Sequence, residues 1–159
     1  MKKGVEKYRS GTLAFIIDSN NKFLVIQKVI YSSSDWTVIG GGRKKNEDAV
    51  DNLFREIKEE LGLGKRNFEI IGKSKSYLQY DYPKEMRKKI HKGKYIGQKY
   101  DQFLLRLIGS KNDIRTNEEI RKVDWVLFGE LQNRLNFEGQ YENAKSVIEE
   151  LLSSKSLNE

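Results

Sequence analysis

Apolar and polar positions follow two periodicities along the chain, one typical of extended segments and one typical of helices. A period of two with β-branched and aromatic residues predicts strands, whereas apolar residues three and four positions apart predict amphipathic helices. The first pattern occurs at 12–17, 22–29, 36–39, 68–75, 77–81, 96–107 and 122–128. The second occurs at 46–61, 128–135 and 141–152. This order of strands and helices predicts an α/β fold, an α/β/α sandwich with a mixed β-sheet between helices.

The chain has no internal repeat and no linker, so we expect its 159 residues to form one domain. Its core would span about 8–152, with a frayed tail from Ser153. No apolar run reaches the ~18 residues that would indicate a membrane span. The apolar run at 12–17 is also too short for a signal-peptide core. Cysteine is absent, which excludes disulfides, a thiol nucleophile and a zinc–thiolate site, and we expect a cytoplasmic protein.

Basic residues outnumber acidic ones, 30 against 23, which gives a formal net charge of +7. Many lie in a polar stretch that we expect to be a loop at 83–94, and in the strand after it: Lys84, Arg87, Lys88, Lys89, Lys92, Lys94 and Lys99. Such a patch attracts polyphosphate or nucleic acid. The same composition also serves solubility, so the charge alone leaves both interpretations open.

The segment 46–61 combines an apolar face with a group of carboxylates. Asn46 is a suitable N-cap, and Gly62 is placed to end the helix. At roughly 100° per residue, Glu56, Glu59 and Glu60 fall within an arc of about 100°. An adjoining face is apolar and is expected to pack on the sheet: Val50, Leu53, Phe54, Ile57 and Leu61. The helix therefore presents clustered glutamates beside a buried face.

Clustered carboxylates on one helix face have two interpretations. They can form a solvated acidic stripe, or they can supply the hard oxygen ligands that suit Mg²⁺ or Mn²⁺. The run Gly40–Gly42 lies just before the helix and lets the backbone turn and approach a phosphate or metal closely. Gly40 is therefore included as a backbone contact in the candidate metal site.

The spacing from Gly41 to Leu63 adds fixed positions around these glutamates. A glutamate follows the glycine six residues later, and then comes Arg-Glu-apolar-any-Glu-Glu-any-Gly-apolar. This segment resembles the Nudix box, G-x5-E-x7-R-E-U-x-E-E-x-G-U with U apolar, at every fixed position. The resemblance implies the α/β/α fold and a hydrolase that cleaves a linkage of a nucleoside diphosphate derivative with Mg²⁺, or Mn²⁺ as substitute. It also implies that Arg55 orients the catalytic and metal-binding glutamates and that Glu47 is its partner.

Segments outside the box resemble one Nudix subgroup, the RNA pyrophosphohydrolases and dinucleoside tetraphosphate hydrolases. The matching segments are Tyr80–Lys84, which reads Tyr-Asp-Tyr-Pro-Lys, the Gly-Gln-Lys segment within 96–105, and the opening Tyr8-Arg9. Glu119 stands where this subgroup carries a further catalytic or metal-linked glutamate. The chain departs from the subgroup before the box, where Trp36–Gly42 lacks the usual proline and the preceding serines replace arginines. The spacing from Phe137 to Tyr141 also differs slightly.

The resemblance implies roles for residues outside the helix. Either Glu56 or Glu119 would accept the proton of the attacking water. Outer phosphates would be held by Arg9, Lys28, Lys44 and Lys99. Tyr80, Phe137 and Tyr141 would stack on a base, unless they are core residues. His91, the only histidine, is interpreted as a surface residue.

The favoured function is removal of pyrophosphate from the 5′-triphosphate end of RNA. The alternatives, in order, are cleavage of dinucleoside tetraphosphates, hydrolysis of another nucleoside triphosphate or a sugar nucleotide, and non-catalytic nucleic-acid binding. A pure binding module has no need of three carboxylates beside phosphate. The sequence therefore favours an enzyme acting on phosphorus-containing anhydrides, with a nucleotide or RNA 5′ end as its partner.

Overall fold

A mixed seven-stranded sheet runs through the computed structural model, which describes residues 7–152. Its strands are β1 (Tyr8–Ile17), β2 (Lys22–Lys28), β3 (Ile39–Gly42), β4 (Phe68–Lys73), β5 (Leu78–Asp81), β6 (Gly97–Leu107) and β7 (Ile120–Leu127). The order is β4-β6-β1-β2-β7, while β3 pairs with β1 and β5 pairs with β6. The β1–β6 pair is parallel and the other pairs are antiparallel.

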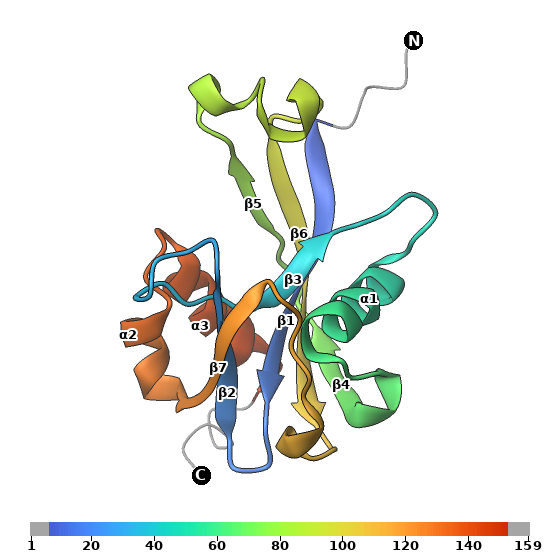
Figure 1. Cartoon of the computed structure of the whole chain (residues 1–159), viewed down its shortest axis with the longest axis vertical. Coiled ribbons are helices and arrows are strands. Elements are labelled where there is room, and N and C mark those ends of the chain that lie inside the picture. The colour runs from blue at the N-terminus through green and yellow to red at the C-terminus, as the bar shows by residue number, and fades with distance from the viewer. Residues whose placement is uncertain (1–6, 153–159) are drawn as a thin grey trace.

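Helices cover both faces of this sheet, as Figure 1 shows. One face carries α1 (Ala49–Leu61), and the other carries α2 (Leu131–Arg134) and α3 (Gln140–Leu151). Alternate residues of the strands point to opposite faces, so the core consists of two apolar clusters. Leu53, Ile57 and Leu61 fill the first cluster, and Val147 and Ile148 fill the second. The predicted α/β/α sandwich is confirmed.

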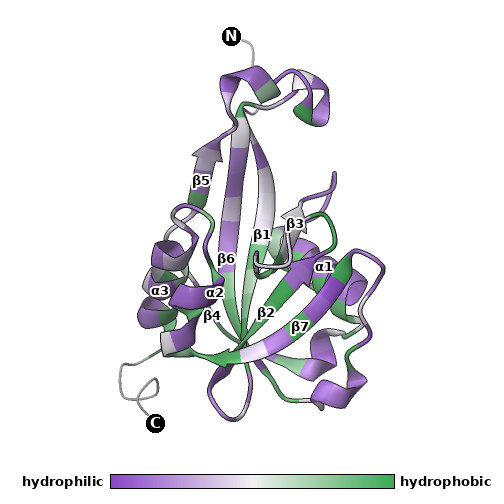
Figure 2. Cartoon of the chain, turned by 60° about the vertical axis from the view of Figure 1, so that its left-hand side comes forward, coloured by the Kyte–Doolittle hydropathy of each residue, from purple (hydrophilic) through white to green (hydrophobic). Residues whose placement is uncertain are grey.

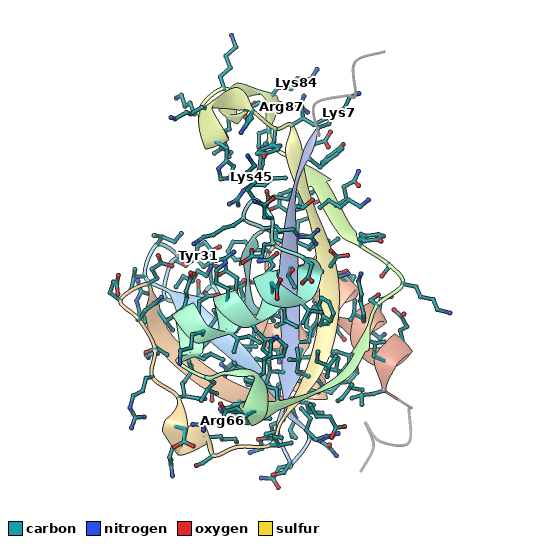
Figure 3. The ribbon with its side chains drawn as sticks, turned by 90° about the vertical axis from the view of Figure 1, so that its right-hand side faces the viewer. Lys7, Tyr31, Lys45, Arg66, Lys84 and Arg87 are labelled. Atoms are coloured by element: carbon teal, nitrogen blue, oxygen red, sulfur yellow. The ribbon has the colours of Figure 1, made fainter. Side chains whose placement is uncertain are left out.

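The starts of β1 and β6 extend beyond the helices together with β5 and form an arm. In Figure 2 the lower parts of β1, β2 and β6 are largely green, and the part of β6 within the arm becomes purple. The segment predicted as a loop at 83–94 closes the end of the arm with two short 3₁₀ turns, at 84–86 and 90–93. Figure 3 shows Lys7, Lys84 and Arg87 at this end and Arg66 at the opposite end of the molecule.

Several predicted element boundaries differ from the structure, most by one or two residues. β1 begins at Tyr8 and not at Thr12, because the parallel pairing with β6 already starts where Tyr8 faces Gly97. The short extended segment predicted at 36–39 becomes a strand only at Ile39. That strand, β3, then continues through Gly40–Gly42, which pair with β1 and so do not form the sharp turn expected of them.

The predicted N-cap of the box helix, Asn46, is wrong. Asp48 caps α1, because its carboxylate accepts a hydrogen bond from the backbone N–H of Asp51 at 2.8 Å. Asn46 lies two residues earlier with a φ of 66°, in a left-handed turn that asparagine tolerates. The predicted end of the helix is confirmed, since Gly62 adopts a φ of 71° and donates its N–H to the Lys58 carbonyl at 2.9 Å.

No helix within 7–152 has the length and apolar character needed to cross a membrane. The predicted frayed tail from Ser153 lies outside the described residues.

Candidate active site

The glycine strand β3 brings α1 unusually close to the sheet. A Cβ atom on Gly41 would overlap the Glu56 carboxylate, and one on Gly40 would come within 2.7 Å of the Leu13 side chain. A Cβ on Gly42 would overlap the Arg9 guanidinium. Side chains therefore lie flat against β3 on both faces, and these positions require glycine for close approach.

Asn52, in the middle of α1, ties the helix to two strands. Its amide nitrogen donates to the Gly42 carbonyl oxygen at 3.2 Å, and its amide oxygen accepts from the Thr12 hydroxyl at 2.7 Å. Both side chains are buried, so these bonds fix the height of the helix above β3. Sequence reasoning missed this pair, whose only signal was a polar residue inside the apolar face of α1.

Arg55 organises the acidic face of the helix. Its Nε and Nη2 donate to the two carboxylate oxygens of Glu47 at 2.7 and 3.0 Å, in a fork geometry. Its Nη1 contacts Glu56 at 3.0 Å and Glu59 at 3.2 Å, and Nη2 also donates to the Gly42 carbonyl at 2.7 Å. The hydrogen bonds from Arg55 lower the pKa of Glu47, which therefore stays ionised. One guanidinium thus orients three carboxylates.

Glu60 is the most buried glutamate of the group. Its Oε1 accepts from the Gly40 N–H at 3.2 Å, and its Oε2 lies 3.6 Å from the Lys28 ammonium. That second oxygen is buried and has no hydrogen-bond partner in the described part of the chain. Burial raises the pKa of Glu60 to about 7, although Lys28 opposes the shift, and the charges of Glu56 and Glu119 add to it. Burial also raises the pKa of Glu56.

The four glutamates of the predicted site come from two parts of the chain. Glu119 lies just before β7, and its side chain is exposed. Its backbone carbonyl accepts the Val29 N–H at 2.9 Å, which holds it beside Lys28, the partner of Glu60. Within residues 7–152, no three acidic or histidine side chains are close enough together to enclose a metal ion. The carboxylates repel one another, and Arg55 and Lys28 hold three of them in ion pairs.

The donor set nevertheless fits a divalent cation. All candidate ligands are hard oxygens, and one buried oxygen, Glu60 Oε2, has no hydrogen bond. An ionised carboxylate in that position is costly unless a positive charge approaches it.

A pocket of about 570 Å³ opens beside this acidic face. Aromatic rings from separate segments line it: Phe15, Tyr31, Tyr80, Tyr100 and Phe137. Tyr31 and Phe137 meet edge to face at 5.1 Å, and the Tyr80 and Tyr100 rings lie 6.3 Å apart. Lys28 and Gly40 also line the pocket, so it adjoins Glu60. We call it the aromatic pocket.

The other predicted binding residues divide between several places. Phe137 and Tyr80 line the aromatic pocket, but Tyr141 packs against the apolar cluster beneath α3 and does not line it. Arg9 lies against Gly42 on the same face of the sheet as the aromatic pocket. Lys44 lies on the loop before α1, and Lys99 lies in another pocket on the opposite face.

Sequence reasoning missed Tyr31 and Tyr100 as pocket residues. Tyr100 stands within the Gly-Gln-Lys segment and faces Leu78 of β5, so strand alternation could have placed it beside Tyr80. Tyr31 had no comparable signal, because only the tertiary fold brings it to Phe137. His91 is exposed at the end of the arm, as expected for a surface residue, with its ring 6.1 Å from that of Tyr95.

Comparisons with known proteins agree on one family. The NUDIX domain model matches residues 7–150. The RNA pyrophosphohydrolase of Ruthia magnifica subsp. Calyptogena magnifica is 34% identical over 123 residues, which cover 76% of this chain and 68% of that protein. The RNA pyrophosphohydrolase of Pelagibacter ubique (strain HTCC1062) is 28% identical over 153 residues, which cover 91% of this chain and 94% of that protein.

A solved structure shows the same fold. The dihydroneopterin triphosphate pyrophosphohydrolase of E. coli superposes with a TM-score of 0.72 at 17% identity, covering 91% of this chain and 99% of that chain. The family model spans the strands, the helices and the acidic face described above. The chain belongs to the Nudix family and is a hydrolase that acts on anhydride bonds, in a family that generally uses divalent metal ions.

Proposed function

We propose that this hydrolase removes pyrophosphate from the 5′-triphosphate end of RNA. The observation that supports the proposal is that the aromatic pocket and the acidic face share two residues. Lys28 and Gly40 both line the aromatic pocket, and both also contact Glu60 on the acidic face. A base in the pocket would therefore place its 5′ phosphates beside the glutamates. The relatives named RNA pyrophosphohydrolase support this substrate.

The glutamates of the acidic face would hold the metal, which we propose is Mg²⁺, with Mn²⁺ as substitute. Glu56, Glu59, Glu60 and Glu119 would supply carboxylate oxygens, and Gly40 would supply its backbone carbonyl. When bound, the metal would neutralise charge at the phosphates and lower the pKa of the attacking water. Its charge would also offset the cost of ionising the buried Glu60.

The chain's own groups would direct the hydrolysis. Water would add to phosphorus, the anhydride P–O bond would break, and pyrophosphate would leave a 5′-monophosphate end. Glu56 or Glu119 would take the water's proton. Arg55 contacts Glu56 and Glu59 at 3.0 and 3.2 Å and would keep them in place.

The substrate would be recognised by the aromatic rings of the pocket and by basic residues near it. Tyr80 and Phe137 are partly exposed, 45% and 40%, and so have free ring area for a base. Arg9 lies on the same face of the sheet and would contact an outer phosphate, and so would Lys28. Lys44, on the loop before α1, would reach phosphate only from outside the pocket.

The test compares 5′-triphosphorylated RNA with diadenosine tetraphosphate at equal concentration in Mg²⁺. Faster release of pyrophosphate from RNA is expected. ATP and AMP from the dinucleotide, with RNA intact, would instead identify a dinucleoside tetraphosphate hydrolase. Glu59→Gln should lose turnover by orders of magnitude, and the exposed Glu149→Gln is the matched control. RNA binding with no turnover of any substrate by the unaltered chain would leave a binding protein only.

A further inference from the structure

A second pocket, of about 320 Å³, lies on the α1 face of the sheet. It is lined by Ser10, Arg43, Ala49, Lys73, Tyr77, Lys99 and Asp101. On β6, Phe103 and Leu105 pack beneath α1 and Leu104 packs on the other side, so alternation directs Lys99 and Asp101 toward α1. Tyr100 points the opposite way, into the aromatic pocket. The sheet therefore separates the two pockets.

The second pocket carries more positive than negative charge. Asp101 pairs with Arg43 at 2.5 Å and with Lys73 at 3.3 Å. Lys99 stands 4.4 Å over the Tyr77 ring, and in the described part of the chain no carboxylate lies within ion-pair distance of it. Three cations around one carboxylate leave a surplus of about two positive charges, counted at neutral pH.

Donors in this pocket also remain unused. Arg43 Nε is buried and has no hydrogen-bond partner among residues 7–152, because the guanidinium reaches Asp101 through Nη2. Within the described segment, the contact recorded for the Lys99 ammonium is with the Tyr77 ring face, and a cation on a ring keeps its N–H groups available to an anion. A guanidinium and two ammonium groups facing one small space are the donors that bind phosphate in proteins.

We propose that this pocket is a phosphate subsite, distinct from the aromatic pocket and from the acidic face. Ala49 lines it and lies seven residues before Glu56 on α1, which places it about 10 Å along the helix from the candidate catalytic carboxylates. The phosphate would belong either to the RNA chain beyond the processed end or to free pyrophosphate. The RNA source rests on the proposed function, whereas anion binding does not.

The test begins with binding alone. Inorganic pyrophosphate is titrated calorimetrically into the full chain in EDTA, so that no turnover is needed. Lys99→Gln and Lys73→Gln should each weaken binding about tenfold, since each removes a charged donor. Arg66→Gln, which lies at the end of the molecule away from the arm and does not line the pocket, is the control and should bind unchanged. Melting temperatures without pyrophosphate show whether each variant is folded.

Asp101→Asn separates a binding role from a structural one. Removing this carboxylate adds one net positive charge to the pocket, so pyrophosphate should bind several-fold more tightly than to the unaltered chain. A purely structural cluster would lose stability on this change and gain no affinity. Unchanged affinity in Asp101→Asn, together with unchanged affinity in Lys99→Gln, would overturn the proposal even if hydrolysis of RNA is observed.

Kinetics then identify the source of the phosphate. With 5′-triphosphorylated RNA of two and ten nucleotides, an RNA-chain site predicts that Lys73→Gln raises KM more for the longer substrate. A pyrophosphate site predicts instead that product inhibition by pyrophosphate weakens equally at both lengths. If the variants lose pyrophosphate binding but no RNA is hydrolysed by any form, the subsite stands and the proposed function fails.

Discussion

The acidic face and the aromatic pocket adjoin each other but are built in different ways. On the acidic face, Glu47, Arg55, Glu56 and Glu59 come from one continuous segment and are joined by hydrogen bonds of 2.7 to 3.2 Å. The aromatic pocket draws its rings from five separate places in the chain, and the ring pairs within it meet edge to face or at a tilt. The proposed catalytic residues would therefore be positioned by local ion pairs, whereas the position of the proposed substrate-binding side chains depends on the whole fold.

This difference predicts how each region responds to mutation. Changes on the acidic face should affect turnover strongly, because orientation of charge determines the rate of reaction. Changes in the aromatic pocket should affect substrate affinity moderately, because each ring contributes separately.

The largest effect is expected on the acidic face. Glu56→Gln removes the charge of a carboxylate that lies against Gly41 and contacts Arg55 at 3.0 Å. Turnover should fall roughly 10²- to 10³-fold or more, measured as kcat on triphosphorylated RNA. Glu149→Gln should retain normal turnover, and an active Glu56→Gln would exclude this residue as base and as ligand.

The next largest effect is expected for Glu60, on the free energy of unfolding in the absence of metal. Its pKa is raised from 4.5 to about 7 in the folded chain, so the folded state resists its ionisation. The contribution of this group to the free energy of unfolding is fully present below about pH 4.5, and it is lost as the pH rises through 7. Glu60→Gln should therefore stabilise the chain by up to roughly 3 kcal/mol at pH 8, where Glu60 of the unaltered chain is ionised, with no gain at pH 4. Urea unfolding in EDTA at both values measures it, and an equal gain at both would contradict the assignment.

Arg55→Lys tests the fork geometry itself. Lysine keeps the charge but cannot hold Glu47 with two parallel bonds while also reaching Glu56 and Glu59. Activity and apparent Mg²⁺ affinity should fall roughly 10- to 100-fold. Arg66→Lys is the matched exchange outside the site, and identical kinetics in the two variants would show that charge alone suffices.

The smallest effect is expected in the aromatic pocket. Phe137→Ala should raise KM about fivefold with little change in kcat, since one stacked ring contributes roughly 1 kcal/mol or more. Tyr141→Ala, which alters the cluster beneath α3, should lower the melting temperature instead. A KM effect from Tyr141 and none from Phe137 would reverse the assignment of the pocket.

The acidic face and the aromatic pocket also differ in how well the sequence predicted them. Apart from Glu119, the acidic face could be predicted because its residues lie within one helix and its flanking loop, where spacing determines geometry. Only the cap was misplaced, since Asn46 and Asp48 are both suitable residues and the turn conformation decides between them. Tyr31 was missed and Tyr141 was placed with the pocket residues, because an aromatic side chain has the same sequence signal in a pocket and in a core. Lys99 was predicted to hold an outer phosphate. It lies on the α1 face of the sheet, away from the aromatic pocket, because strand register determines the face that a residue occupies.

The parallel pairing of β1 with β6 has a consequence for folding. Every pair in this register joins residues about 90 positions apart, from Tyr8 with Gly97 to Ile17 with Arg106. Closing so long a loop is slow compared with forming α1, and a chain still being synthesised cannot form this pair until β6 has emerged. The aromatic pocket takes Tyr80 from β5 and Tyr100 from β6, so the site is complete only after these strands have joined β1. Catalytic competence should therefore appear late in refolding, after helical signal, and the onset of activity would time the closure of the sheet.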